Sequence, residues 1–133
     1  MATVAATNFQ IHGFTTPNGF QKASDGKQVV GCFVSFRTLA GTYAAADDAT
    51  LSGVGAAIAA SRRDGRTVTL MQAAMAAPGK KADGTVIGTL APTVSSDAII
   101  VPLTQADLST EHANGALNDE LSEPITLFVL FKH

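Results

Sequence analysis

The side chains best suited to metal binding and nucleophilic catalysis in this chain are three histidines and one cysteine. His12, His112 and His133 show no metal-ligand spacing, either among themselves or to Cys32, and no carboxylate cluster accompanies them. Cys32 lies in the apolar stretch 29–36, whereas a reactive thiolate needs a positively charged, partly exposed setting. We therefore predict a buried, unreactive cysteine, no catalytic residue, no metal and no cofactor.

The segment Gly53-Val54-Gly55-Ala56-Ala57-Ile58 is similar to the start of a dinucleotide-binding fingerprint. The third glycine position of that fingerprint needs Gly or Ala, but the residue there is Ile58. Both glycines of the segment also fall inside an expected helix rather than in the turn before it. Close packing explains the segment better. The small residues Ser52, Ala56 and Ala60 form a smooth face on this helix. Another backbone can approach that face closely, either from the chain's own sheet or from a neighbouring copy.

Two kinds of charged cluster remain as candidates for ligand binding. The acidic runs Asp47-Asp48 and Asn118-Asp119-Glu120 lack the alternating ligands of a calcium loop. The basic residues at 62–66 and at 80–81 could contact phosphate only if the fold brings them together, and one Tyr with no Trp offers little for base stacking. With a net charge of −2, we expect no specific nucleic-acid partner.

The composition favours one domain, residues 1–133, whose surface is easily covered by other subunits. The 133 residues are enough for one hydrophobic core, and charged residues make up only 15% of them. An ordinary soluble domain has roughly 25% charged residues. The N-terminus does not look like a signal peptide and no apolar run is long enough to span a bilayer, so we expect no membrane partner and synthesis in a cytoplasm.

Alternation of apolar and polar residues predicts a mainly β fold. Period-two patterns appear around Phe9 and Ile11 and around Val68 and Leu70, and Asp-Gly or Asn-Gly turn signals stand at residues 18, 25, 64 and 83. Further strands are expected at 27–39, 85–90, 98–103 and 125–131. The six or seven strands do not alternate regularly with helices, so we predict a β-sandwich or a partial barrel.

One α-helix is expected at 49–63, inserted between these strands. Asp47 and Asp48 are its candidate N-caps, Gly65 its candidate left-handed terminator, and Leu51, Val54 and Ile58 its apolar stripe. A second, short helix is expected near 105–113.

The C-terminal run, 125–131, is apolar at odd and even positions alike, which is typical of a strand covered on both faces. It must dock in its own sheet or, as an exchanged strand, across a subunit boundary. The candidate interface residues are therefore those of this run together with the small helix face: Ile125, Leu127, Phe128, Val129, Leu130, Phe131, Ser52, Ala56 and Ala60.

Two segments, 42–50 (TYAAADDAT) and 63–69 (RDGRTVT), resemble those of small structural proteins of tailed bacteriophages, as does the Thr-, Ala- and Gly-rich style of the whole chain. The resemblance covers about a third of the residues and implies a capsid cement or decoration protein. Such a protein is a compact β domain, often a homotrimer, that binds the major capsid protein where capsomers meet. The implied location is the virion capsid, reached from the host cytoplasm. No extended arm is evident beyond the first few residues.

Two other classes stay open. The first is a head-to-tail connector or a tail structural protein of the same kind of virion, which would form rings. The second is a small monomeric ligand-binding domain or enzyme, which requires a polar pocket holding at least two of four residues: His12, His112, Asp47 and Glu120.

Overall fold

The computed structural model describes residues 2–4, 9–15, 23–37, 48–63, 65–110, 112 and 120–133. In this part of the chain ten strands and one α-helix occur, so the predicted mainly β fold with one helix is confirmed. Some sequence expectations concern residues outside the described part: the Asn18-Gly19 turn, Asp47, Asp64, and Asn118 with Asp119.

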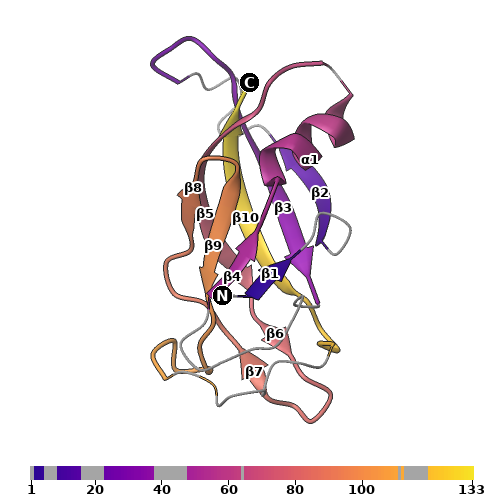
Figure 1. Ribbon diagram of the computed structural model, residues 1–133, viewed down its shortest axis with the longest axis vertical. Helices are drawn as coiled ribbons and strands as arrows, with labels where there is room; N and C mark the ends of the chain where they lie inside the picture. The colour runs from indigo at the N-terminus through magenta and orange to yellow at the C-terminus, as the bar shows by residue number, and fades with distance from the viewer. Residues whose placement is uncertain are drawn as a thin grey trace.

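Two four-stranded sheets are stacked face to face (Figure 1). Sheet A has the order β1-β4-β9-β8 and consists of β1 (Ala2–Val4), β4 (Asp48–Leu51), β9 (Ala98–Pro102) and β8 (Thr93–Ser95). Sheet B has the order β2-β3-β10-β5 and consists of β2 (Phe9–Thr15), β3 (Val29–Phe36), β10 (Ile125–Lys132) and β5 (Thr69–Ala77). A small hairpin of β6 (Gly79–Lys80) and β7 (Val86–Ile87) lies at the lower end.

The core lies between the two sheets and follows the alternation seen in the sequence. In β3 the side chains of Val30, Cys32, Val34 and Phe36 are at most 3% exposed. Leu127 lies opposite Val34, and Val129 lies opposite Cys32, in the antiparallel ladder between β10 and β3. Residues opposite each other in a ladder share one face of the sheet, so these side chains form one apolar layer against sheet A.

Only one face of β10 is fully buried, which corrects the expectation that both faces are covered. The side chains of Ile125, Leu127, Val129 and Phe131 are buried in the core, whereas Thr126, Phe128, Leu130 and Lys132 alternate with them and are half-buried. The strand is intramolecular and occupies the centre of sheet B, between β3 and β5.

Helix α1 (Val54–Arg62) begins five residues later than expected. Residues 49–51 form part of β4 instead, because they pair with residues 99–101 of β9, and Asp48 also lies in this strand rather than at a helix cap. Gly53 is the N-cap with φ 71°, and Arg63, not Gly65, is the left-handed C-cap with φ 58°. Leu51 is still buried beside Val54 and Ile58, but from a strand.

Two other expected elements differ from the structure. The strand expected at 85–90 is reduced to β7, two residues long. In the expected helix at 105–113, the described residues 105–110 form a turn. The Asp107 carboxylate accepts hydrogen bonds from the backbone N–H groups of Ser109 and Thr110, at 2.9 and 2.8 Å. Such bonds from an Asp side chain to nearby backbone groups compete with helix formation.

The two leucines of β10 test the orientation of this strand. Leu127 is fully buried and Leu130 is half-buried on the opposite face. We expect Leu127→Ala to lower the free energy of unfolding by about 2–5 kcal/mol, because it leaves a core cavity. Leu130→Ala, the matched control, should cost about 1 kcal/mol or less. Urea unfolding followed by circular dichroism measures both, and equal losses would contradict this orientation.

Candidate functional site

The three histidines lie on different elements and have different partners. His12 is exposed on β2, where its ring stacks on Phe33 with centroids 5.9 Å apart. His112 is buried and its Nε2 lies 2.8 Å from the carbonyl oxygen of Thr104. His133 follows β10 and lies next to arginines. Among the described residues, no three His, Cys, Asp or Glu side chains come together as a metal-binding group.

The Gly53-Val54-Gly55 segment serves close packing at the start of α1. A Cβ atom at Gly55 would lie 2.1 Å from Oδ1 of Asp97, so the carboxylate occupies the space that a side chain would need. The backbone N–H of Val54 also donates to the carbonyl oxygen of Asp97, at 2.9 Å. A carboxylate of the chain itself therefore lies against the first turn of this helix, where a dinucleotide would place its pyrophosphate.

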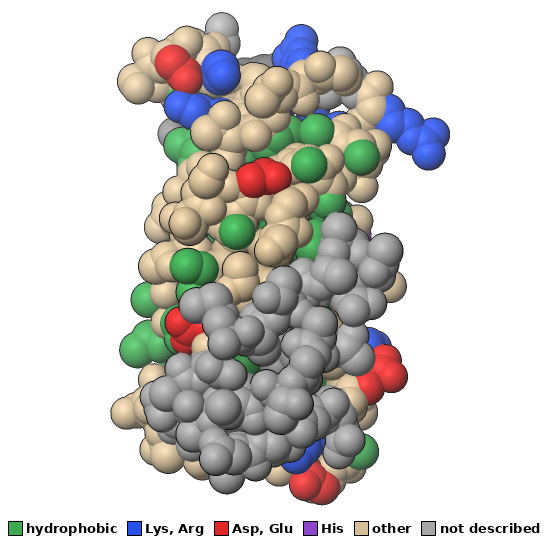
Figure 2. Space-filling model, viewed as in Figure 1, with side chains coloured by type: hydrophobic (Ala, Val, Ile, Leu, Met, Phe, Trp, Pro, Cys, Tyr) green, Lys and Arg blue, Asp and Glu red, His purple; other side chains and the backbone are tan. Residues whose placement is uncertain are grey.

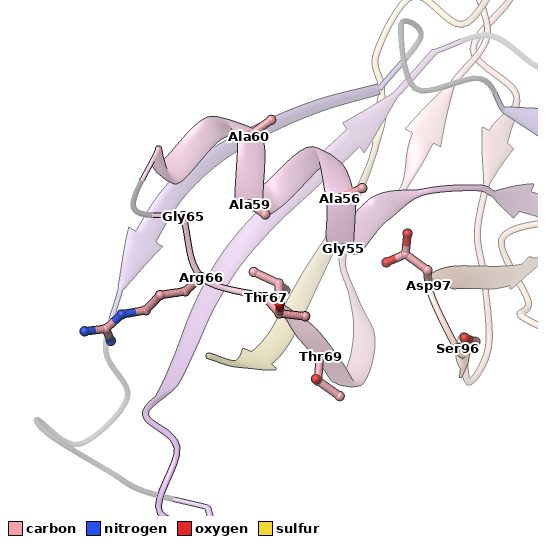
Figure 3. Close-up of a pocket in the computed structure, with 11 residues that line it drawn as sticks. Gly55, Ala56, Ala59, Ala60, Gly65, Arg66, Thr67, Thr69, Ser96 and Asp97 are labelled. Carbon is pink, nitrogen blue, oxygen red and sulfur yellow. The ribbon is translucent and has the colours of Figure 1, made fainter.

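The small-residue face of α1 borders an open hollow with a volume of about 720 Å³ (Figure 3). Ala56, Ala59 and Ala60 form one side, and the segment from Gly65 to Thr69 faces them. Ser96 and Asp97 lie at one end, while the Arg66 side chain points away from the hollow. Of the candidate interface residues, Ala56 and Ala60 are thus accessible here, and Ser52 is exposed in the turn before the helix.

This hollow does not match the polar pocket required by the ligand-binding alternative. His12, His112 and Glu120 are not among the residues that line it, and Asp47 lies outside the described residues. The two basic groups are also apart, because Arg62 ends α1 at the upper end of the molecule and Lys80 lies in β6 at the lower end (Figure 1). The fold therefore does not combine them into one phosphate-binding surface.

The outer face of sheet B is the most distinctive surface in the described part of the chain. The register places Phe33 of β3 opposite both His12 of β2 and Phe128 of β10. Phe33 and Phe128 are half-buried, with ring centroids 5.4 Å apart. We call His12, Phe33 and Phe128 the aromatic ladder. It crosses three neighbouring strands on the side away from the core.

Two glycines allow the rings of this ladder to lie against the sheet. A Cβ atom at Gly31 would lie 2.5 Å from Cζ of Phe128, and one at Gly13 would lie 2.8 Å from Cδ2 of Phe33. Each ring therefore covers a glycine of the adjacent strand, an arrangement that stabilises glycine-containing strands. Each ring is thus packed on the backbone of the adjacent strand and stays partly exposed.

The residues directly beside the ladder are uncharged, whereas Lys132 lies further along β10 on the same outer face, where it pairs with Asp25. Leu130 lies on the same face as Phe128, and the register adds neutral neighbours: Gln10, Ser35, Gln72, Ala74 and Thr126. The outer face of sheet A is more polar, since Thr50, Thr93 and Ser95 surround the half-buried Ile100. Of the two outer faces, that of sheet B is the easier to desolvate.

No family model, no curated protein and no solved structure matches this chain. No helix in the described residues is long and apolar enough to cross a membrane.

Four of the candidate interface residues, Ile125, Leu127, Val129 and Phe131, are core residues of the chain itself and offer no contact surface. Phe128 and Leu130 remain accessible. Sequence reasoning considered His12 only as a candidate ligand or pocket residue and did not single out Phe33. The alternating pattern of their strands could have placed both on the face opposite to the buried Val34 and the partly buried Ile11.

Cys32 is fully buried, and burial raises the pKa of its thiol to about 12. We therefore expect the native protein at pH 8 not to react with Ellman's reagent, because a protonated and inaccessible thiol is a poor nucleophile. Reaction should become complete after unfolding in guanidinium chloride. Fast labelling of the native state would contradict the core position of this residue.

Proposed function

We propose that this chain is a non-enzymatic structural protein of a virion, a capsid cement or decoration protein that acts through protein–protein contacts. The observation that carries the proposal is the outer face of sheet B, where two phenylalanine rings and Leu130 lie in a surface of mostly uncharged residues. Aromatic residues are enriched and charged residues depleted at the centres of protein interfaces. The resemblance to small phage structural proteins supplies the setting.

The proposed occupants of this face are other copies of the chain, as a trimer, and the major capsid protein. A largely uncharged apolar face can meet a second copy without opposing like charges, which supports self-association. A connector or tail protein of the same kind of virion would use the same face. The number of copies in the oligomer therefore distinguishes the two roles. We expect a trimer for the cement protein and a larger ring for the connector.

The substitution Phe128→Asp tests this face in the free chain. A carboxylate at a desolvated position should weaken association by roughly thirtyfold or more, the size of effect seen at interface hot spots. Because Phe128 is half-buried on the outer side, the fold should persist, as circular dichroism can verify. Thr93→Asp, which places the same charge on the exposed outer side of sheet A, is the matched control. Light scattering after size exclusion reports the mass of each variant.

A wild-type trimer that Phe128→Asp alone dissociates would support the proposal, whereas a wild-type monomer would overturn self-association through this face. The role in the virion has a separate test. Quantitative mass spectrometry of purified particles from the source should find many copies per particle. Absence of the chain from the particles would overturn the capsid role whatever the mass of the free chain.

A further inference from the structure

Positively charged side chains gather at the upper end of the molecule, and an acidic side chain lies among them (Figure 2). Backbone hydrogen bonds between Gln28 and His133, at 3.2 and 3.1 Å, bring the turn before β3 next to the end of β10. Both Arg62 and Arg66 contact His133 from the other side. The described basic residues at this end are Lys27, Arg62, Arg63, Arg66 and Lys132, in a chain whose net charge is −2.

Arg62 is held in place by aromatic rings. Its guanidinium carbon lies 5.5 Å from the ring centroid of Phe14 and 5.6 Å from that of Phe131. The two rings meet edge to face, 6.2 Å apart, and Nη2 of Arg62 lies 3.2 Å from Nε2 of His133. Cation–π contacts and the hydrogen bond restrict the side chain, so little conformational entropy is left to lose on binding.

Arg63 and Arg66 extend this group to the surface. Both are exposed, and Nη1 of Arg66 lies 3.5 Å from Nδ1 of His133. Phe14, beside Arg62, is 39% exposed. The surface thus combines guanidinium groups with an accessible aromatic ring.

Among the described residues, the acidic Asp25 lies at this end and pairs with Lys132. Nζ of Lys132 lies 2.8 Å from Oδ2 of Asp25. The hydrogen bond from Lys132, followed by that from the backbone N–H of Lys27, holds the pKa of Asp25 below its ordinary value. This carboxylate is therefore ionised near neutral pH and is engaged by lysine.

We propose that Phe14, Arg62, Arg63 and Arg66, the arginine end, bind an acidic surface of a partner protein. Arg and aromatic residues are enriched at protein interfaces, and guanidinium groups bind carboxylates in a bidentate geometry. A nucleic acid fits less well, because this surface offers only three guanidinium groups for the phosphate backbone and one exposed aromatic ring for base stacking. The arginine end is separate from the aromatic ladder, so the inference does not depend on the proposed function.

Fluorescence anisotropy with a labelled oligoglutamate peptide at low salt tests this surface, with a labelled DNA duplex of equal charge as the competing probe. The full chain should bind the peptide more tightly than the DNA. In the double variant Arg63→Gln and Arg66→Gln, affinity for the peptide should fall roughly three- to tenfold, as expected for two exposed ion pairs. The double variant Lys80→Gln and Lys81→Gln makes the same change of charge at the other end and should bind like the wild type.

Three results would overturn the inference. They are the absence of peptide binding by the wild type, an equal loss of affinity in both double variants, and tighter binding to DNA that depends on Arg63 and Arg66. The last result would assign the surface to phosphate. Both double variants change exposed or half-exposed side chains only, and unfolding curves that match the wild type exclude a general loss of fold.

Discussion

The pairing of β10 with both β3 and β5 is the constraint on which sheet B and the core depend. Four alternate side chains of β10 are at most 1% exposed and close the apolar layer against sheet A: Ile125, Leu127, Val129 and Phe131. The partner strands come from residues 29–36 and 69–77, so this sheet is completed by contacts distant in sequence. Such pairings are costly in chain entropy until apolar burial compensates for them.

The same strand also shapes the outer surface. Phe128 lies over Gly31 because a glycine leaves room for its ring, and Phe33 lies over Gly13 for the same reason. The aromatic ladder therefore has an intramolecular role as cross-strand packing, and it leaves each ring partly exposed. A face built in this way is stable in the free chain and remains apolar enough to be covered by a partner.

The two proposed contact surfaces differ in their charge. The aromatic ladder lies among mostly uncharged residues in the middle of sheet B, whereas the arginine end carries guanidinium groups beside Phe14 and Phe131. Covering an uncharged face does not require a charge to be removed from water. Exposed arginines act over a longer range and orient an approaching acidic partner. Two surfaces of different chemistry are suited to contacts with two different neighbours.

The sequence by itself determined the class of fold, three strands and the burial of Cys32, because alternation and turn residues are local properties. Those strands were expected at 27–39, 98–103 and 125–131 and are found at 29–36, 98–102 and 125–132. Tertiary structure decided the start of α1, since residues 49–51 pair with residues 99–101, and local propensity contains no information about that partner. Tertiary structure also decided whether the odd-numbered or the even-numbered residues of β10 face the core. Both sets contain apolar side chains, so the sequence pattern does not distinguish the two orientations. The contacts of Arg62 with Phe14 and Phe131 join three distant segments, and only the folded chain brings them together.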